Sequence, residues 1–424
     1  MEKSFLAQAR YAFWTEIQVR TLVFRNIFRK RGVLWVVRGL FKHFALLGLW
    51  IILFPFSLVL HIVGVRRLTV RVEHIGHLAG EIDCFLKERR LARLPQRIYV
   101  IVAPPNRVAN EHLLRYWKPY FNVVTDSGLG LMLEAMSRWL VLKQDINKYM
   151  GSKHWTQCIY EINATWGDRP PVVSLSAEDE EWGREAIEKL GVPRDSWFVC
   201  VHMREGKFLP HNELIQQHRN ADIITTYSAM QEIVGRGGWC VRIGDRSMTP
   251  LPSMPGVIDY ACHPLKSPRL DIILSAKSRF FLGCNSGLAL VSATFGVPCA
   301  LTNMLPVSTL AARKVDISIP KLLRLDTASR YLTFREIMSS PTSRFFFSYQ
   351  YDRAGIRILD NTGDEVRDLV VEMLNRMDGT FVDTEEDRDL QRRYMALFKP
   401  GHYAYGAASR IGAAFLRKYR HLLD

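Results

Sequence analysis

The sequence lacks the short motifs that mark several common enzyme classes. It contains no G-x-x-x-x-G-K-[ST] loop, no G-x-G-x-x-G followed by an acidic residue, no G-x-S-x-G and no H-E-x-x-H. These absences argue against nucleotide hydrolysis at a P-loop, an ordinary nicotinamide-binding fold, a serine-hydrolase elbow and a helical zinc-protease site. With 48% hydrophobic and 23% charged residues, the composition is nevertheless typical of a globular protein.

Cysteine is scarce and does not occur in pairs. There are seven cysteines in 424 residues, none in a C-x-x-C pair, and several lie inside apolar runs such as "FVCVHM" and "VPCAL". Neither a zinc site nor a disulfide framework is indicated. We therefore expect the main body of the protein to reside in a reducing compartment such as the cytosol.

Acidic residues are nearly absent from the first 72 positions. This segment holds twelve Lys or Arg but only Glu2 and Glu16, a net charge of +10 out of +15 for the whole chain. It also contains the longest apolar run, "FALLGLWIILFPFSLVLHIVGV" at residues 44–65, in which His61 is the only ionisable side chain. A basic segment around such a run predicts a membrane partner rather than a nucleic acid.

The apolar run is long enough to reach across a bilayer core, at about 1.5 Å per residue. Its position and length do not fit a cleavable signal peptide. Pro55, near the middle of the run, favours a helical hairpin that enters the membrane and returns, with both cationic flanks on anionic lipid. A single crossing and a buried soluble helix are the alternatives. We expect residues 1–70 to form a membrane-associated helical segment on the cytoplasmic face of the inner membrane, anchored by residues 44–65.

The rest of the chain alternates short apolar strands with helices. Strands are expected in "RIYVIVAPP", "FNVVTDSG", "WFVCVHMRE", "GGWCVRIGD", "PGVIDYA", "SRFFLGC" and "VPCALTN". This pattern is typical of the α/β class with doubly wound parallel sheets. We expect two Rossmann-like domains facing each other across a cleft, at residues 71–190 and 191–375, followed by a helical tail at 376–424. The basic end of that tail, "RIGAAFLRKYRHLL", is predicted to pack across the domain interface or to touch lipid.

Polar side chains gather where three strands of the second domain end. Ligands of parallel sheets bind beyond the carboxyl ends of the strands. Guanidinium groups and the unpaired N–H groups of a helix N-terminus both suit phosphate, so we expect a ligand that carries a diphosphate. For each residue alone, a salt bridge, a helix cap or a turn is the alternative role. The candidate donor-binding residues are His202, Arg204, Arg242, Gly244, Asp245, Asn285, Ser286 and Gly287.

A second polar group lies in the segment "RNADI". Arg219 is predicted to contact the ligand, since no helix requires an arginine there. Asn220 and Asp222 are predicted either to contact the ligand or to cap the helix that follows. Lys321, in "ISIPKLLR", could reach the same region, but a solvated loop lysine is the favoured interpretation.

These segments together resemble a known family. "VHMREGKF", "RNADIITTYSAMQEIVGRGGWCVRIGD", "MTPLP", "DYA", "FFLGCNSGLALVSATFGVP" and "LTN" are similar, in this order, to bacterial glycosyltransferases encoded in surface-polysaccharide gene clusters. The resemblance runs over residues 71–375 and extends more distantly to GT-B transferases of the fucosyltransferase-like and heptosyltransferase-like groups. It implies a GT-B fold with a nucleotide-sugar donor in the second domain. Arg204 would then grip the donor diphosphate opposite Ser286 and the N–H groups around Gly287.

A transferase that inverts the sugar needs a base for the acceptor hydroxyl. The corner "VEHIGHLAGEID" follows a predicted strand of the first domain and offers several candidates. His77 and Glu81 are four residues apart, which places them on one helix face, although a solvated Glu81 is the alternative. His77, Glu81 and Glu73 are therefore the catalytic candidates.

The sequence thus predicts a membrane-anchored glycosyltransferase that moves a sugar from a nucleotide-sugar donor to a lipid-linked or growing surface polysaccharide, such as capsule, O-antigen or exopolysaccharide. Because fixed hydrogen-bond donors can stabilise the leaving diphosphate, we expect no metal and no cofactor besides the donor substrate. One alternative is a nucleotide-sugar epimerase of GT-B-like fold, which would need no membrane segment. A non-catalytic GT-B scaffold in polysaccharide assembly is the other, and donor binding without turnover would indicate it.

Overall fold

The computed structural model describes residues 2–137, 141–149, 158–206 and 215–424. The chain forms two compact units that alternate along the sequence. The two units differ from the predicted linear domains, whose boundaries fell at 70, 190 and 375. The first unit comprises Met1–Thr69, Arg97–Pro104 and Phe121–Gln144, and the second comprises Val70–Gln96, Pro105–Tyr120 and Asp145–Asp424.

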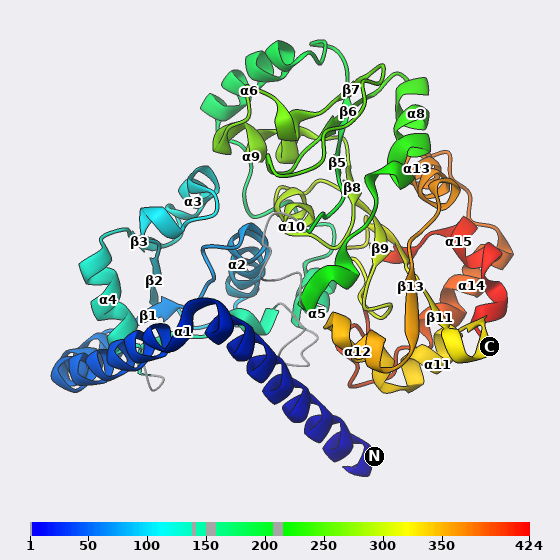
Figure 1. The fold of residues 1–424 in the computed structure, drawn as a ribbon. Helices are drawn as coiled ribbons and strands as arrows, with labels where there is room; N and C mark the ends of the chain where they lie inside the picture. Colours follow the sequence, from blue (N-terminus) through cyan, green and yellow to red (C-terminus); the bar gives the residue numbers. More distant parts are fainter. Residues whose placement is uncertain (1, 138–140, 150–157, 207–214) are drawn as a thin grey trace. The chain divides into compact units, whose positions relative to one another are not determined.

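The first unit is built on a parallel sheet in the order β3-β2-β1-β4 (Figure 1). Its strand β2 is short and apolar with a buried interior, as a central parallel strand requires, whereas β1 includes Arg66 and Arg67. Two helices, α1 and α4, pack against each other in this unit. The elements are α1 (Glu2–Ile62), β1 (Val65–Leu68), β2 (Ile98–Val102), β3 (Asn122–Val124), α4 (Ser127–Met136) and β4 (Lys143–Gln144).

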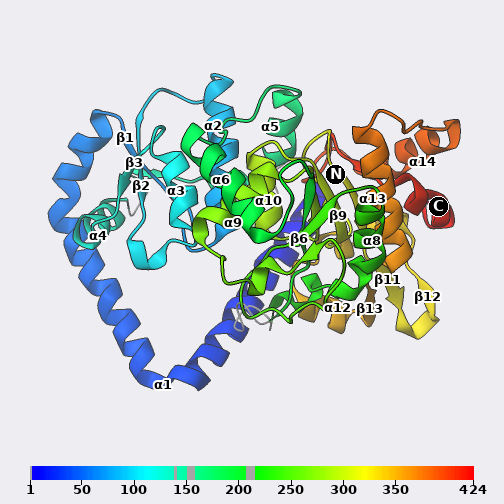
Figure 2. The ribbon, with the colours of Figure 1, turned by 90° about the horizontal axis from the view of Figure 1, so that it is seen from above.

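The predicted hairpin at Pro55 is wrong, because α1 continues through this residue to Ile62. A proline in a helix removes one backbone donor and bends the chain, but it does not reverse it. The break in α1 lies instead at Gly32, whose φ of 65° is left-handed and easily adopted only by glycine, and Figure 2 shows the two arms that meet there. The second arm, Gly32–Ile62, is long and apolar enough to cross a membrane.

The second unit contains a seven-stranded parallel sheet in the order β14-β10-β9-β8-β5-β6-β7. From β5 the chain adds β6 and β7 on one side, then returns to add β8, β9 and β10 on the other. This is the strand order of a Rossmann fold, as the alternation of strands and helices predicted. The strands are β5 (Phe198–His202), β6 (Trp239–Arg242), β7 (Val257–Ile258), β8 (Phe281–Gly283), β9 (Cys299–Met304), β10 (Ile317–Pro320) and β14 (Arg410–Ile411).

Helices cover both faces of this sheet, so its central strand is buried on both sides. Val199 and Val201 of β5 belong to the core shared with α8 (Tyr227–Gly235) and α13 (Gly363–Met377). Phe198 and Cys200 belong to the core on the opposite face. That second core includes α6 (Ala177–Leu190), α9 (Pro268–Lys277) and α10 (Gly287–Thr294).

Segments that precede the large sheet in sequence also belong to the second unit. The helix α3 (Glu111–Trp117) packs on α9, and α2 (Ile82–Arg90) packs on α5 (Cys158–Trp166). A π-helical turn at His77–Glu81 leads into α2 and packs on α10. These contacts explain why the compact units do not follow the predicted linear boundaries.

The predicted separate tail is part of the second unit. β14 pairs with β10 and completes the sheet, while α15 (Ala413–Lys418) packs on α13 and on α14 (Glu385–Met395). The sequence pattern did not reveal β14, which has only two residues. It also did not reveal a small antiparallel sheet formed by β11 (Leu322–Leu325), β12 (Arg330–Tyr331) and β13 (Ile356–Leu359), nor the short helices α11 (Phe334–Ser339) and α12 (Ser348–Arg353).

Candidate functional site

The candidate site lies in the second unit, where the strand order reverses between β5 and β8. His202 ends β5 and pairs with Gly283, which ends β8. The loops that leave two such strands run to opposite faces of the sheet, and the crevice between them is where open α/β sheets bind ligands. Arg204 follows β5, and the corner Asn285-Ser286-Gly287 follows β8, so the structure brings these two predicted groups to one place.

Ser286 stands at the N-cap of α10 but does not cap it. Its backbone is extended (φ −133°, ψ 165°), as at an N-cap, yet its side chain accepts no hydrogen bond from the first turn. The hydroxyl is buried, with the residue 8% exposed, and its oxygen has no hydrogen-bond partner in the described structure. A buried hydroxyl normally has a partner. At the start of α10 the Ser286 hydroxyl therefore lies beside backbone amides that it does not cap. Such a group of hydrogen-bond donors is a suitable place for an anion.

Two guanidinium groups approach this corner. Arg204 Nη1 donates to the carbonyl of Gln216 at 3.1 Å and to the side-chain oxygen of Asn220. Arg219 Nη2 donates to the carbonyl of Asn285 at 2.6 Å, which ties the "RNADI" segment directly to the α10 corner. These contacts fix the two guanidinium groups beside the start of α10.

Lys321 is buried, and the interpretation as a solvated loop lysine is wrong. Its Nζ donates to the carbonyl of Asn220 at 2.6 Å and pairs with Asp360 at 2.7 Å. Through the Asn220 carbonyl, Lys321 thus fixes the segment that carries Arg219. Burial, and to a lesser extent the charges of Arg219, Lys321 and Arg204, lower the pKa of His218 to about 3.

Arg242 does not serve the site as predicted. It is fully buried between Glu205 at 2.8 Å and Asp259 at 2.9 Å. Two carboxylates occupy its fork, so no part of it is exposed to a phosphate. Arg242 instead braces the loop after β5, which carries Glu205, against the loop after β6, through a bond to the Thr249 carbonyl at 3.1 Å.

The remaining predicted donor residues have structural contacts. His202 is buried, its Nδ1 lies 3.0 Å from the carbonyl of Ile243, and burial lowers its pKa to about 4. Gly244 has φ 155°, and a Cβ there would lie 2.1 Å from the sulfur of Met248. Asp245 accepts from the Ser247 amide at 2.8 Å in a turn.

Asp222 caps the helical turn Ile223–Thr226 by accepting from the Ile224 amide at 2.9 Å. This is the capping role that the sequence left open. The neighbouring Asn220 instead supplies its side-chain oxygen to Arg204 and its carbonyl to Lys321. Asn220 thus connects Arg204 with Lys321.

A contact between two glycines joins the α10 corner to the catalytic candidates. A Cβ on Gly76 would lie 2.7 Å from the Cα of Gly287, and a Cβ on Gly80 would lie 3.3 Å from the side chain of Leu290. Gly76 and Gly80 are four residues apart and present bare backbone to α10. The spacing of the two glycines in "GHLAG" could have indicated this close helix contact, but the sequence analysis treated the segment only as a corner. His77 directly follows the contact with Gly287.

His77 and Glu81 form a dyad. Nδ1 of His77 lies 2.8 Å from Oε1 of Glu81, whose side chain is fully buried, while the His77 side chain is partly exposed. Burial raises the pKa of Glu81, and its hydrogen bond with His77 opposes that rise. The alternative of a solvated Glu81 is therefore wrong. Glu73 is exposed and lies 3.9 Å from Arg107, so it does not join the dyad.

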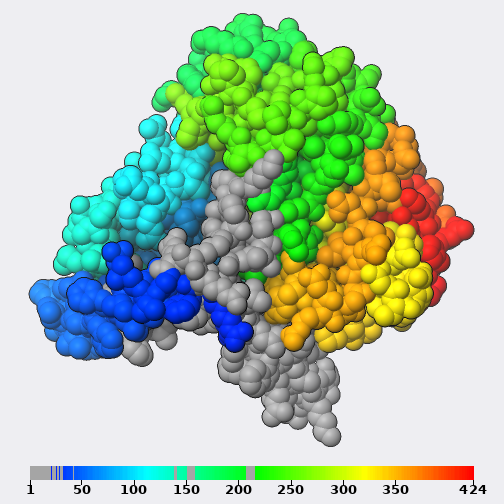
Figure 3. All heavy atoms as spheres, in the orientation of Figure 1, coloured from blue at the N-terminus to red at the C-terminus, as the bar shows by residue number. Residues whose placement is uncertain are grey.

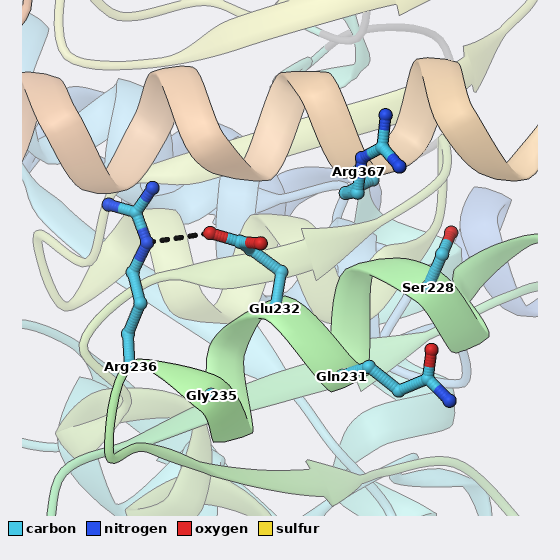
Figure 4. Close-up of a pocket in the computed structure, with 6 residues that line it drawn as sticks. All are labelled: Ser228, Gln231, Glu232, Gly235, Arg236 and Arg367. Carbon is cyan, nitrogen blue, oxygen red and sulfur yellow. Dashed lines mark hydrogen bonds and ion pairs between the residues drawn. The ribbon is translucent and has the colours of Figure 1, made fainter.

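A polar hollow of about 390 Å³ lies elsewhere in the second unit, between α8 and α13 (Figure 4). Its two arginines are paired with carboxylates: Arg236 with Glu232 at 2.7 Å, and Arg367 with Asp364 at 3.2 Å. It is a salt-bridged surface groove, and Arg236 offers a matched control for the arginines of the α10 corner. The lining residues are Ser228, Gln231, Glu232, Gly235, Arg236 and Arg367.

Neither a protein-family model nor a curated protein sequence matches this chain. Solved structures that are similar include TibC, an iron-containing dodecameric glycosyltransferase from enterotoxigenic E. coli H10407, at 13% identity over 67% of this chain and 61% of that one, with a TM-score of 0.34. TibC as a heptosyltransferase in complex with ADP-D-β-D-heptose matches at 13% identity over 57% of this chain and 58% of that one, with a TM-score of 0.35. A glycosyl transferase of family 9 from Veillonella parvula DSM 2008 matches at 11% identity over 72% of this chain and 80% of that one, with a TM-score of 0.30.

These structural neighbours are glycosyltransferases, and heptosyltransferases are among the distant groups that the sequence resembles. The matched region spans less than two thirds of the TibC chain in both structures. At these identities and TM-scores the likeness is distant, so the function proposed next rests on the residues of this chain.

Proposed function

We propose that this protein is a glycosyltransferase of GT-B type that transfers a sugar from a nucleotide-sugar donor to a lipid-linked or growing surface polysaccharide. The observation that carries the proposal is the buried, unpartnered hydroxyl of Ser286 at the start of α10, which lies at the β5/β8 crevice with Arg204 and Arg219. Hydroxyl, amides and guanidinium groups together match the oxygens of a diphosphate.

The donor diphosphate would bind at the α10 corner, which includes the backbone of Asn285. Its oxygens would accept from the Ser286 hydroxyl, from the first amides of α10 and from Arg204. When the bond between the sugar and the diphosphate breaks, negative charge develops on the leaving group. Fixed donors stabilise that charge without having to reorganise, so this arrangement can promote departure with no metal in the step.

The His77–Glu81 dyad would supply the base. With Nδ1 held by the buried carboxylate, Nε2 is the ring nitrogen that accepts a proton from the attacking acceptor hydroxyl. Glu81 would fix the tautomer and stabilise the imidazolium that forms. The contact between Gly76 and Gly287 links this dyad to the donor corner within one unit.

The experiment is a binding measurement on the full chain. A panel of nucleoside diphosphates and nucleotide sugars is titrated by calorimetry into the wild type, Arg204→Ala, Ser286→Ala and the control Arg236→Ala. We expect one donor to bind the wild type, with at least about tenfold weaker binding to Arg204→Ala and Ser286→Ala, since hydrogen bonds to charged groups contribute about 1.5–3 kcal/mol. Arg236→Ala should bind as the wild type does.

Two outcomes would refute the proposal. One is that no member of the panel binds to the wild type. The other is that both site variants bind as tightly as the control. Binding of one donor without transfer to any acceptor would instead favour the non-catalytic scaffold.

A further inference from the structure

The apolar surface of the first unit is larger than the α1 run alone. Between Phe44 and Ile62, only one stripe of α1 packs on protein: Leu53 is buried against Met136 and Leu142, with Leu49 and Leu60 beside it. Many other large apolar side chains of this stretch are exposed. They include Phe44, Ile51, Ile52, Phe56, Val59 and Ile62.

The helix α4 adds to this surface. Its Leu133 and Met136 pack on α1, whereas Leu129, Leu131 and Met132 are 55%, 42% and 38% exposed. Figure 3 shows the blue atoms of α1 next to the turquoise atoms of this part of the chain on the molecular surface. Two neighbouring helices that expose this many large apolar side chains form a contiguous patch of the kind that marks an interaction site.

The charge of the first unit identifies the partner. Its segments contain fourteen Lys or Arg and four Asp or Glu, a net charge of +10, whereas the much longer second unit carries only +5. Exposed cations, Arg38 on α1 and Arg97 before β2, belong to the same unit as the apolar patch. An apolar face in a unit of strongly positive net charge complements an anionic lipid bilayer.

The packing also limits how α1 can meet the bilayer. The end of α1 is tied to its unit, because Leu53 packs on Met136 and His61 is hydrogen-bonded to the carbonyl of Val141. α4 has ten residues, which is about 15 Å of helix, half of the roughly 30 Å of a hydrocarbon core. Along residues 49–60, where α1 packs beside α4, α1 cannot enter lipid without bringing α4 with it.

We infer that α1 and α4 enter one leaflet together, as a monotopic surface on an anionic membrane, and that α4 is a second lipid-inserted element. Leu129, Leu131 and Met132 lie in lipid beside the outward face of α1. The surrounding cations lie at the level of the headgroups. This inference does not depend on the proposed glycosyl transfer, because it rests on the first unit alone.

Vesicle flotation tests the inference. Full-length protein is transferred from mild detergent to phosphatidylcholine vesicles with or without 30% phosphatidylglycerol. The variants are Leu131→Glu/Met132→Glu and the matched control Ile224→Glu, which alters a residue 61% exposed in the second unit. We expect the wild type and the control to float with anionic vesicles, and the α4 double variant to lose at least about tenfold in partitioning. Binding of the wild type should weaken on neutral vesicles.

A second measurement keeps the test valid if the double variant folds poorly. Leu131→Cys, made in a Cys262→Ser background and labelled with an environment-sensitive fluorophore, should shift its emission to the blue on anionic vesicles. Ile224→Cys in the same background should not. An aqueous signal from position 131 on bound vesicles, or equal flotation of the folded double variant and the wild type, would overturn the inference and leave α1 as the sole anchor.

Discussion

At the scale of single residues, burial gives Glu81 and Glu73 different properties although both belong to the same short segment. Glu81 is fully buried and holds Nδ1 of His77, and burial raises its pKa. Glu73 is exposed and lies 3.9 Å from an arginine. Only the first can fix an imidazole and stabilise its charge, so in the proposed reaction Glu81 would position His77 and His77 would take the proton.

Replacement of the dyad should therefore lower turnover without affecting donor affinity. His77→Ala should lower kcat by about 10²–10⁴-fold, the usual contribution of a positioned base. Glu81→Gln should lower kcat with KM for the donor unchanged, because neither side chain supplies the contacts assigned to the diphosphate. Steady-state kinetics with Glu73→Gln as the control check this. A loss in Glu73→Gln as large as in His77→Ala would contradict the assignment.

Two buried histidines should make the protein sensitive to acid. Burial lowers the pKa of His202 to about 4 and of His218 to about 3, against about 6.5 in an unfolded chain. Between pH 6.5 and pH 4 the unfolded state therefore binds protons that the folded state excludes, and stability falls as pH falls. His218→Gln should reduce the slope of unfolding free energy against pH by about 1.4 kcal/mol per unit in this window. Denaturant melts at several pH values measure it, and an unchanged slope would show that His218 is not neutral in the fold.

Residue types at the strand ends could be predicted, but their partners could not. Arg204 and Arg242 lie at neighbouring strands, and the sequence offers no reason to treat them differently. The structure separates them because Arg242 is enclosed by Glu205 and Asp259. Lys321 was misjudged for the same reason, since a remote carboxylate, that of Asp360, allows it to be buried.

At the scale of elements, the junction of α10 with the turn before α2 determines the site. Gly76 and Gly287 allow the two backbones to meet, and this contact sets where His77 stands relative to the start of α10. A side chain at either position would force the elements apart. The turn His77–Glu81, which the sequence placed in the first predicted domain, here packs on α10 of the second unit.

Gly76→Ala should therefore damage both stability and function. Its Cβ would meet the Gly287 backbone at 2.7 Å, which cannot move aside as a side-chain tip can. We expect a loss of about 1–3 kcal/mol in unfolding free energy, typical of overpacking, and weaker donor binding. Gly235→Ala on α8 is the matched control, since nothing lies within 4 Å of its Cβ, and it should be neutral or stabilising. Equal melting and donor affinity of the two variants would show that the junction is loose.

The element pattern was predicted well where hydrophobic periodicity is strong and poorly where it is weak. The strands around β5 are apolar runs bounded by turn residues, and the predicted segments contain β5, β6, β8 and all of β9 except Met304. Pro55 misled the prediction because a proline in an apolar run reads as a turn, whereas helix packing on α4 tolerates it. The two residues of β14 carry no periodicity at all, and only pairing with β10 makes them a strand.

At the scale of the whole molecule, charge and chemistry are divided between the units. The first unit holds most of the positive charge and the apolar face, and the second holds the α10 corner and the His77–Glu81 dyad. This division would suit the proposed glycosyltransferase if its acceptor is attached to the membrane that the first unit is proposed to bind. Confinement of both to one surface raises their effective concentration without any new contact.

This leads to a kinetic prediction that joins the two proposals. An acceptor glycan on a long lipid in anionic vesicles should be used at least about tenfold faster than the same glycan on a short, water-soluble tail, because surface confinement supplies effective concentration. Leu131→Glu/Met132→Glu should remove that advantage and leave the rate on the soluble acceptor unchanged, since α4 lies in the first unit and the donor corner in the second. Radiolabelled donor and both acceptors, measured side by side, give the ratio of the two rates.

A ratio near one in the wild type would mean that the membrane surface has no part in the choice of acceptor. A loss on both acceptors in the variant would mean that α4 serves the catalytic fold rather than the bilayer.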